Sequence, residues 1–436
     1  MKPLFELERN NINTDWRVVK IKRVLAIPIT DGPHETPELL EDGVPFLSAE
    51  AVKKGKLNFN LKRGYISRED HEKYIKKCKP QRDDVFMVKS GATTGNVAMV
   101  ETDEEFSIWS PLALIRANTE LVLPKYLYYF IDSVAFREQV EVSWSYGTQQ
   151  NIGMKVIENL FISLPPLEIQ GKLVDYIIYK VKDIDELIER KETLIELLEQ
   201  HRQSIITEVV TKGLNPNVKM KDSGVEWIGE IPVHWEISKI KYQADINKNT
   251  LAETTDSLYE MQYIDIGSVN SKGELSTLEK YRFSDAPSRA RRKVKKGDTI
   301  VSTVRTYLKA ISTIESEDEN LVCSTGFAVL TARKKIREKY LSYLFKSTIY
   351  VDEIVSRSTG VSYPAINASE IGNLECLLPS LEEQKEIEIY IEKRLLEIDK
   401  IVKIIIKQIE KLKEYRQSII YEAVTGKIDV RKLELD

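Results

Sequence analysis

Two closely similar stretches, "HRQSIITEVVTKG" at residues 201–213 and "YRQSIIYEAVTGK" at residues 415–427, decide how this chain of 436 residues is built. Eight of the thirteen aligned positions agree, including an unbroken Arg-Gln-Ser-Ile-Ile. The first stretch starts at 201 and the second at 415, so the two are related by a 214-residue offset. A repeat on this scale is tested first because it determines the whole fold.

The repeat extends far upstream of these two stretches. At the same offset, "LPPLEIQ" (164–170) aligns with "LPSLEEQ" (378–384). Near the start of each copy the offset becomes 219, where "DWRVVKIK" (15–22) faces "HWEISKIK" (234–241). The chain is therefore predicted to consist of two diverged copies of one unit of about 214 residues.

The residue pattern changes within each copy at the Leu-Pro. Before it, β-branched runs are broken by Gly, Pro and Asn, which predicts short strands mixed with a few helices. After it there is no proline and almost no glycine until Gly213 in the first copy and Gly426 in the second. Proline before and glycine after such a run are the expected ends of a helix. Each helix would be about 65 Å long.

Apolar residues form a heptad seam in each predicted helix. The seam of the second copy is unbroken, and that of the first has one polar position, Lys191: Ile391, Leu395, Ile398, Val402, Ile405, Ile409 and Leu412 align with Ile177, Val181, Ile184, Ile188, Lys191, Ile195 and Leu198. A single seam would be typical of a helix packed on its own domain, whereas two matched seams favour mutual packing. If the copies are related by a two-fold axis, the helices run antiparallel.

The predicted fold is therefore α+β, with two globular domains of mixed α/β structure separated by two long antiparallel coiled-coil-like helices, related by an internal pseudo-two-fold repeat. The globular domains span 1–163 and 234–377, the helices span 164–213 and 378–428, and a linker spans 214–233. A chain of this length is too long for one hydrophobic core.

The remaining composition excludes several classes of protein. No apolar run approaches the roughly 18 residues of a membrane span, and the N-terminus has no signal-peptide pattern. Cys78, Cys323 and Cys376 are isolated, and the four histidines are scattered, so neither disulfides nor a metal site is predicted. These features predict a cytoplasmic protein.

The net charge of −4 conceals two basic runs. Residues 53–82 hold eleven Lys and Arg against three acids, and residues 280–296 hold eight against one. One such run is usually a solvated face, but two runs at matching positions with interleaved aromatics favour phosphate binding. The predicted phosphate contacts are Lys62, Arg63, Arg68, Lys73, Lys76 and Lys77 in the first copy, and Arg282, Arg289, Arg291 and Arg292 in the second.

Base contacts are expected from polar loops rather than from the basic runs. The candidates are Thr93, Thr94, Tyr146, Gln149, Gln150, Asn151, Arg305, Tyr307, Ser362 and Tyr363. The side-chain amides among them can pair with adenine through two hydrogen bonds, although the same residues also suit ordinary turns.

Catalytic motifs are missing from the sequence. It contains no Walker A, His-Glu-x-x-His, Gly-x-Ser-x-Gly or Asn-Pro-Pro-Tyr/Phe pattern. "SGATTGN" (90–96) lacks the Lys-Ser/Thr of a phosphate-binding loop, so a turn between strands is the favoured interpretation. The chain is therefore predicted to have no catalytic or metal-binding residues of its own.

Taken with these motifs, the chain resembles the DNA-specificity subunits of type I restriction–modification systems along essentially its whole length. The resemblance rests on "LPPLEIQ" and "LPSLEEQ", on "RQSIITEVVTKGL" and "RQSIIYEAVTGKI", and on the linker "NPNVKMKDSGVEWIGEIPVHWEISKIK" (215–241). "GDTIVSTVRTYLKAI" (297–311) is similar to a common form of the DNA-reading domain of this family. The first domain is more divergent and keeps mainly "DDVFMVKSGATTGNVA" (83–98).

This resemblance implies two target recognition domains, each reading one half of a split site in double-stranded DNA, with the helices as a ruler. It implies two modification subunits, docked on the helices, that methylate adenine with S-adenosylmethionine. It also implies two restriction subunits that use ATP and Mg²⁺. The chain itself would bind no cofactor and perform no chemistry. Two alternatives stay open: a coiled-coil scaffold that binds only proteins, and a nuclease or methyltransferase acting alone.

Overall fold

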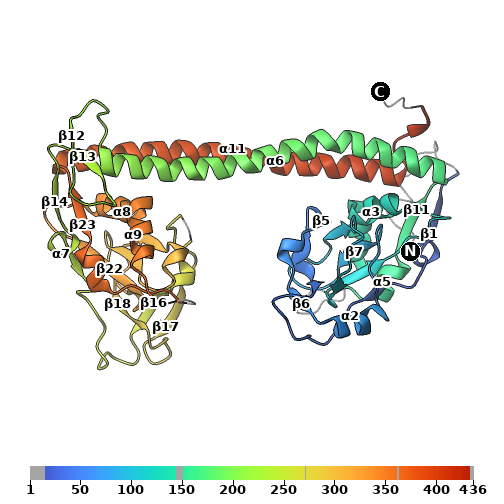
Figure 1. The fold of residues 1–436 in the computed structure, drawn as a ribbon, viewed down its shortest axis with the longest axis horizontal. Helices are drawn as coiled ribbons and strands as arrows, with labels where there is room; N and C mark the ends of the chain where they lie inside the picture. Colours follow the sequence, from blue (N-terminus) through green and yellow to red (C-terminus); the bar gives the residue numbers. More distant parts are fainter. Residues whose placement is uncertain (1–14, 144–150, 271, 361–362, 433–436) are drawn as a thin grey trace. The chain divides into compact units, whose positions relative to one another are not determined.

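The computed structural model describes residues 15–143, 151–270, 272–360 and 363–432. By its internal contacts the chain divides into two compact units: unit 1 comprises 1–191 with 407–436, and unit 2 comprises 192–406. Each unit consists of one globular domain together with part of each long helix (Figure 1). The bounds predicted from the sequence for the two domains, the two long helices and the linker remain predictions.

Unit 1 is built, in its described residues, from a six-stranded sheet of order β2-β10-β7-β8-β5-β4, a three-stranded sheet β6-β3-β9 and the pair β1-β11. All four residues of β7 and of β10 are buried, because helices and the smaller sheet cover both faces. The strands are β1 (Arg17–Lys20), β2 (Thr30–Asp31), β3 (Val44–Leu47), β4 (Val52–Lys53), β5 (Gly55–Leu57), β6 (Gly64–Ile66), β7 (Val85–Val88), β8 (Val97–Met99), β9 (Ser107–Ile108), β10 (Leu112–Ile115) and β11 (Phe161–Leu164). The shorter helices are α2 (Arg68–Ile75), α3 (Pro124–Asp132), α4 (Val134–Ser143) and α5 (Met154–Asn159).

Unit 2 contains, in its described residues, the sheets β15-β22-β19-β20 and β17-β16-β21-β18 and the pairs β14-β23 and β12-β13. The strands are β12 (Met220–Asp222), β13 (Glu230–Pro232), β14 (Glu236–Lys239), β15 (Ala244–Ile246), β16 (Glu260–Ile264), β17 (Glu279–Arg282), β18 (Ala290–Lys293), β19 (Thr299–Ser302), β20 (Ile311–Thr313), β21 (Leu321–Ser324), β22 (Phe327–Ala332) and β23 (Glu375–Leu378). The shorter helices are α7 (Ile240–Gln243), α8 (Glu338–Lys346), α9 (Thr348–Ser356) and α10 (Ala368–Asn373).

The two domains match element by element at the offsets found in the sequence. At the 214-residue offset, β7, β8, β11, α3 and α5 have the same bounds as β19, β20, β23, α8 and α10. At the 219-residue offset β1 matches β14, and the antiparallel pairing of β1 with β11 recurs as that of β14 with β23. The predicted mixed fold with an internal repeat is confirmed.

The two long helices are α6 (Leu167–Lys212) and α11 (Leu381–Thr425). Each ends at a glycine in the left-handed region, Gly213 with φ of 74° and Gly426 with φ of 79°. Glycine adopts this conformation without a Cβ clash, which ends the helix. The prediction that these two glycines close the helices is confirmed.

The glutamine six residues after the leucine of each Leu-Pro motif has the same structural role in both units. Gln170 of α6 is fully buried, accepts a hydrogen bond from the Leu123 backbone N–H (2.8 Å) and donates to the Pro165 carbonyl (2.8 Å). Gln384 of α11 makes the equivalent bonds to the Arg337 N–H (2.8 Å) and the Pro379 carbonyl (3.0 Å). Each glutamine thereby fastens the start of a long helix to its own domain.

Within each unit, α6 and α11 run antiparallel. In unit 1, Arg416 binds Asp185 (2.8 Å), and Lys191, the polar position of the seam, donates to Gln408 (2.7 Å). In unit 2, Arg202 pairs with Asp399, which is the same contact at the 214-residue offset. The seam residues Ile177, Val181, Ile184 and Ile188 in unit 1, and Ile391, Ile398, Val402 and Ile405 in unit 2, are buried.

The end of each long helix contacts the domain of the other sequence copy. The Tyr126 hydroxyl of the first copy donates to the Val424 carbonyl at the end of α11 (3.3 Å). The Tyr340 hydroxyl of the second copy donates to the Val210 carbonyl at the end of α6 (3.4 Å). Each unit therefore combines residues of both sequence copies, and neither copy by itself supplies a complete unit.

Candidate nucleic-acid interface

Each domain carries an exposed loop at the same place, between β7 and β8 in unit 1 and between β19 and β20 in unit 2. Both loops are held by a second segment through matching backbone hydrogen bonds. In unit 1 the Ile152 N–H donates to the Lys89 carbonyl (2.8 Å), and in unit 2 the Ile366 N–H donates to the Thr303 carbonyl (2.9 Å). A bridge of Ser90 with Asn151 in unit 1 recurs as a bridge of Val304 with Ala365 in unit 2. We call residues 90–96 loop 1 and residues 304–310 loop 2.

Loop 2 carries two of the predicted base-contacting residues, Arg305 and Tyr307, and a third, Tyr363, contacts Arg305. The Arg305 guanidinium lies 4.8 Å from the centre of the Tyr363 ring, and the Arg305 N–H donates to the Pro364 carbonyl (2.8 Å). Tyr307 and Tyr363 are 53% and 65% exposed, which is unusual for aromatic side chains and leaves both rings available to a ligand. Ser362 lies outside the described residues.

Loop 2 is braced against its own domain by Thr306. This side chain is buried, and its hydroxyl lies 2.9 Å from the hydroxyl of Ser358, two residues after the end of α9. Residues 306–308 form a short 3-10 turn whose two flanking residues, Arg305 and Lys309, have φ values of 49° and 54°.

Loop 1 has the same course with different side chains. Thr94 donates to the Gly91 carbonyl (2.6 Å) within the loop, and Thr93 is half-buried. Asn151 is exposed and pairs with Ser90 through the bridge between them. The predicted residues Tyr146, Gln149 and Gln150 lie outside the described residues.

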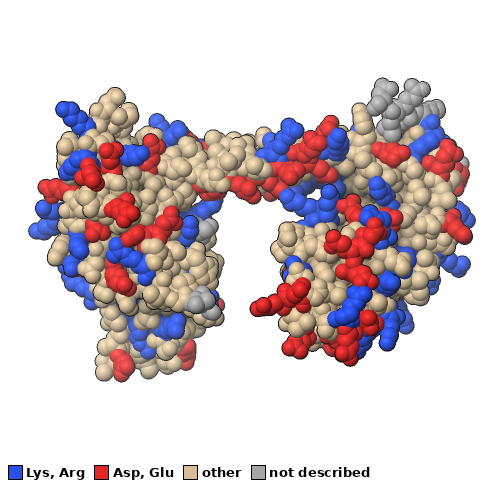
Figure 2. All heavy atoms as spheres, viewed as in Figure 1, with Lys and Arg blue, Asp and Glu red and all other residues tan. Residues whose placement is uncertain are grey.

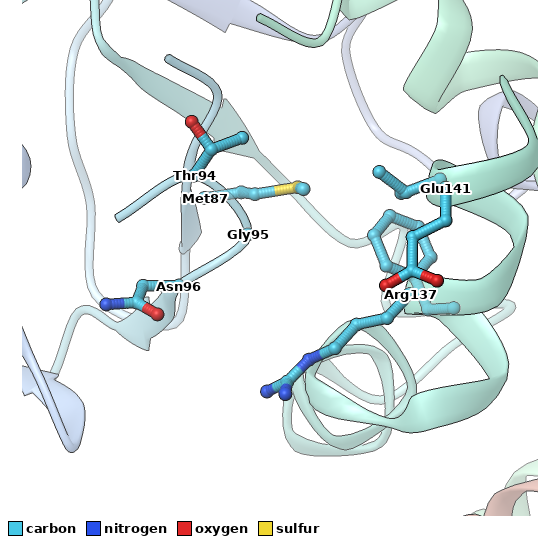
Figure 3. Close-up of a pocket in the computed structure, with 8 residues that line it drawn as sticks. Met87, Thr94, Gly95, Asn96, Arg137 and Glu141 are labelled. Atoms are coloured by element: carbon cyan, nitrogen blue, oxygen red, sulfur yellow. The ribbon is translucent and has the colours of Figure 1, made fainter. Parts of the chain in front are cut away.

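A pocket of about 120 Å³ separates loop 1 from α4 (Figure 3). Met87, Phe136 and Val140 form its apolar lining, and Thr94, Gly95, Asn96, Arg137 and Glu141 supply the rest of its wall. The equivalent place in unit 2 holds only about 10 Å³. It is lined there by Thr306, Val351 and Ile354 among others, and Val351 stands at the position of Arg137.

Three of the six predicted phosphate-binding cations of domain 1 are paired with acids from elsewhere in the chain. Arg68 pairs with Glu105, Lys73 with Glu35 (2.6 Å) and Lys77 with Asp31 (2.5 Å). Figure 2 shows the result as intermixed acidic and basic side chains on the visible face of unit 1. Sequence reasoning missed these acids because all three lie outside the run and reach it only in the folded domain.

Asp31 is the most buried of these acids and also holds Lys89 (3.2 Å), directly before loop 1. Although burial alone would raise it, the pKa of the Asp31 carboxyl is lowered by the hydrogen bonds and charges of Lys77 and Lys89. The position of Lys89 is occupied by Thr303 in unit 2, whose hydroxyl donates to the Gly326 carbonyl (2.9 Å). The two loops are therefore fastened by different chemistry, an ion pair in unit 1 and a neutral hydrogen bond in unit 2.

Two other cations of domain 1 lie against aromatic rings. The Arg63 guanidinium lies 4.0 Å from the centre of the Trp109 ring, and the Lys62 ammonium lies 4.7 Å from that of Tyr65. Neither side chain has a carboxylate partner among the described residues, and the same holds for Lys76. These three cations are the better placed phosphate candidates of domain 1.

The four predicted cations of domain 2 differ in exposure. Arg282 and Arg289 are exposed, and Arg291 lies 4.7 Å from the Phe283 ring. Arg292 is partly buried, and its Nε has no hydrogen-bond partner among the described residues. Burial lowers the pKa of its guanidinium, and this partly buried side chain is less accessible to a phosphate than the exposed Arg282 and Arg289.

The other chemistry-bearing residues remain apart. Among the residues that the structure describes, no group of His, Cys, Asp and Glu is arranged to hold a metal ion. Cys78 and Cys323 are buried free thiols, and burial raises the pKa of each to about 12. No described helix is long and apolar enough to cross a membrane.

Known proteins with this architecture are similar along nearly the whole chain. The chain is 24% identical to the type I restriction enzyme MjaVIII specificity subunit of Methanocaldococcus jannaschii, over 98% of this chain and 96% of that protein. It is 21% identical to the StySPI specificity subunit of Salmonella potsdam, over 97% and 91% of the two chains. A solved structure concerned with assembly and conformational transition of the type I R-M system has the same fold, with a TM-score of 0.63, 18% identity, and coverage of 96% of this chain and all of that one.

The family model for the type I restriction modification DNA specificity domain matches the chain twice. The matches cover residues 13–200 and 232–411, one in each half of the chain. This chain belongs to the family of type I restriction–modification DNA specificity proteins and carries the specificity domain in two copies.

Proposed function

We propose that this chain selects the DNA sequence on which a type I restriction–modification complex acts, with each domain reading one half of a bipartite site. The observation that carries the proposal is the recurrence of one exposed loop, with the same backbone anchoring, in two domains related by the 214-residue offset. Two domains that hold the same loop but differ in its side chains can select two different half-sites. Sequence-reading residues commonly lie on variable loops held by a rigid scaffold.

Base edges are contacted by loop 1 with Asn151, and by loop 2 with Tyr363. Phosphates are contacted by Lys62, Arg63 and Lys76 in domain 1 and by Arg282, Arg289 and Arg291 in domain 2, and these contacts set the position of each domain on the duplex. Phosphate contacts supply affinity that falls with salt, whereas base contacts supply sequence preference. The amides of Gln149, Gln150 and Asn151 are suited to adenine.

The long helices set the distance between the two half-sites and bind the modification subunits. Support for docking comes from apolar side chains that remain exposed on α6 and α11 within each unit: Ile178, Tyr179 and Leu187 in unit 1, and Leu194, Leu197, Ile389, Leu396, Ile401 and Ile404 in unit 2. Exposed apolar patches of this kind are typical of protein interfaces. Two modification subunits would bring adenine methylation with S-adenosylmethionine, and two restriction subunits would bring ATP-driven cleavage with Mg²⁺. The chain itself would act in the cytoplasm without bound cofactor or chemistry of its own.

The test is affinity purification of the tagged chain from its host, followed by methylome sequencing of the host with and without the gene. We expect a methyltransferase subunit to copurify and a bipartite methylated motif to disappear on deletion. Copurification of proteins with no methyltransferase, and an unchanged methylome, would instead support a protein-binding scaffold.

A further inference from the structure

Loops 1 and 2 place two residues each in the left-handed region at the same two positions. In loop 1 these are Gly91 and Gly95, with φ values of 101° and 93°. In loop 2, at the 214-residue offset, they are Arg305 and Lys309, with φ values of 49° and 54°. Glycine populates positive φ without a clash, whereas a side chain there places its Cβ close to the backbone. The sequence of loop 2 is therefore less favourable for its own conformation than that of loop 1.

Three other non-glycine residues of the described chain have positive φ, and each has a local explanation. Lys54 precedes Gly55 in a two-residue turn between β4 and β5, where both positions require positive φ. Asn247 and Asp83 are residue types that tolerate this region, and Asn247 also accepts a hydrogen bond from the Val329 N–H (2.9 Å). Neither Arg305 nor Lys309 is a residue type that tolerates this region, and neither side chain hydrogen-bonds to its own loop among the described residues.

The backbone of loop 2 is held in place without help from these two side chains. The Arg305 N–H donates to the Pro364 carbonyl (2.8 Å), and its carbonyl accepts from the Leu308 N–H (2.8 Å). The Lys309 N–H donates to the Thr306 carbonyl (3.0 Å). Every one of these bonds would also form with glycine at 305 and 309. Their side chains therefore need a reason outside the fold, and strained residues of this kind concentrate at functional sites.

Both side chains are exposed and have no carboxylate partner among the described residues. A Cβ added at Gly91 or Gly95 of loop 1 would meet no atom within 4 Å, so these two positions of the shared loop face open space. The Arg305 guanidinium lies over the Tyr363 ring, 4.8 Å from its centre, and makes no side-chain hydrogen bond among the described residues. A planar guanidinium donates two parallel hydrogen bonds to guanine O6 and N7, and a lysine contacts a phosphate as a point charge.

We propose that Arg305 reads a guanine in the half-site of domain 2 and that Lys309 binds a neighbouring phosphate, both being kept in spite of their unfavourable backbone conformation. This assignment rests on the proposed function and adds to it a base identity and a residue, Lys309, that sequence reasoning did not select. It also makes the two domains unequal, because loop 1 has no cation at either position.

The experiment replaces each residue by the glycine that loop 1 already uses. Arg305→Gly and Lys309→Gly are made in the full chain, assembled with its modification subunits. Methylome sequencing reads the recognised motif, a fluorescent duplex of about 40 base pairs reads affinity between about 50 and 200 mM KCl, and thermal unfolding reads stability. Lys239→Gln, at the end of β14 and away from loop 2, is the matched loss of one positive charge.

We expect Arg305→Gly to make one guanine position of one half-site degenerate and to weaken binding to the intact site about tenfold or more. Lys309→Gly should keep the motif and lower the salt slope by about one, whereas Lys239→Gln leaves both unchanged. Neither glycine variant should have a lower Tm than the natural chain, since glycine relieves the strain.

Three outcomes overturn the inference: a lower Tm for the glycine variants, which would make the two residues structural; an unchanged motif with Arg305→Gly; or an unchanged salt slope with Lys309→Gly. Failure of the proposed function is seen separately, in the unaltered chain. In that case the assembled natural chain itself would mark no bipartite motif.

Discussion

Loop 1 and loop 2 have the same backbone course but reach it in different ways. Loop 1 uses glycines at its two left-handed positions, is fastened at its base by a buried ion pair, and leaves a pocket of about 120 Å³ beside α4. Loop 2 uses Arg305 and Lys309 at those positions, is fastened by neutral hydrogen bonds, and leaves only about 10 Å³. A shared backbone course thus tolerates a different side chain at all seven loop positions. The anchoring hydrogen bonds, which are made by the backbone, are what both loops keep.

The largest expected effect comes from changing the spacing of the two units while leaving both loops intact. Inserting four residues after Arg190 adds about 6 Å of helix and turns it by about 400°, close to a full turn, so the apolar seam stays nearly in register. The preferred gap between half-sites should grow by one or two base pairs, at about 3.4 Å each, with both half-site sequences unchanged. Methylome sequencing of a strain with the insertion measures this. An unchanged gap between the half-sites, or altered half-site sequences, would contradict the proposal that the long helices set this distance.

Removing the ion pair between Asp31 and Lys89, at the base of loop 1, should destabilise unit 1 and leave unit 2 unchanged. Asp31→Asn leaves Lys89 buried without its counter-charge, which costs about 3 kcal/mol of unfolding free energy. The equivalent neutral change, Thr303→Val in unit 2, should cost about 1 kcal/mol. Thiol labelling during denaturation resolves the units, because the buried Cys78 belongs to unit 1 and Cys323 to unit 2. Equal losses in both units would mean that the two loop bases are energetically alike.

Acid should lower the stability of unit 1 more than that of unit 2. Despite its burial, Asp31 has a folded pKa that Lys77 and Lys89 lower from the ordinary 3.8, so its contribution to stability is present above that value and is lost as the pH falls through the folded pKa. The pKa of Asp298 in unit 2 is raised by burial, so its contribution is present at low pH and is lost as the pH rises through the raised value. Between about pH 5 and pH 3, unit 1 should weaken relative to unit 2. Pulse labelling of Cys78 and Cys323 with a thiol reagent active in acid measures this, and parallel behaviour of the two thiols would contradict it.

A smaller effect is expected from the amides predicted to read bases in domain 1. Replacing Gln149 and Gln150 by Ala should cost about 1 to 3 kcal/mol of discrimination at one half-site and leave the other unchanged. Methylation of a panel of duplexes with single changes in each half measures this difference. Loss at both halves would indicate a folding defect instead.

The smallest effects should come from single phosphate contacts, and they depend on the environment of each cation. Arg291→Ala should weaken binding of all sequences alike and lower the salt slope by about one. Arg292→Ala, which removes a partly buried side chain, and Arg68→Ala, which removes one already paired with Glu105, should leave the slope nearly unchanged. Titrations of one duplex at several KCl concentrations distinguish these variants. Equal slope changes for all three would show that exposure in the free chain does not decide which cations bind DNA.

The sequence by itself determined the repeat, the two long helices with their glycine ends, and the positions of both loops. These features follow from local rules, because helix periodicity and terminal residues act over a few positions, and because the 214-residue offset relates one copy to the other without knowledge of contacts.

Only the tertiary structure decided which of the predicted phosphate-binding cations are paired with acids or partly buried. The acids Asp31, Glu35 and Glu105 reach the basic run of domain 1 from distant positions, and a buried guanidinium Nε without a hydrogen bond among the described residues sets Arg292 apart from Arg291. Charge counting along a chain cannot reveal this, because an ion pair depends on distance in space and on exclusion of water. The fully buried Gln170 and Gln384, and the tyrosines that reach the end of the other copy's helix, likewise act through contacts that exist only after folding.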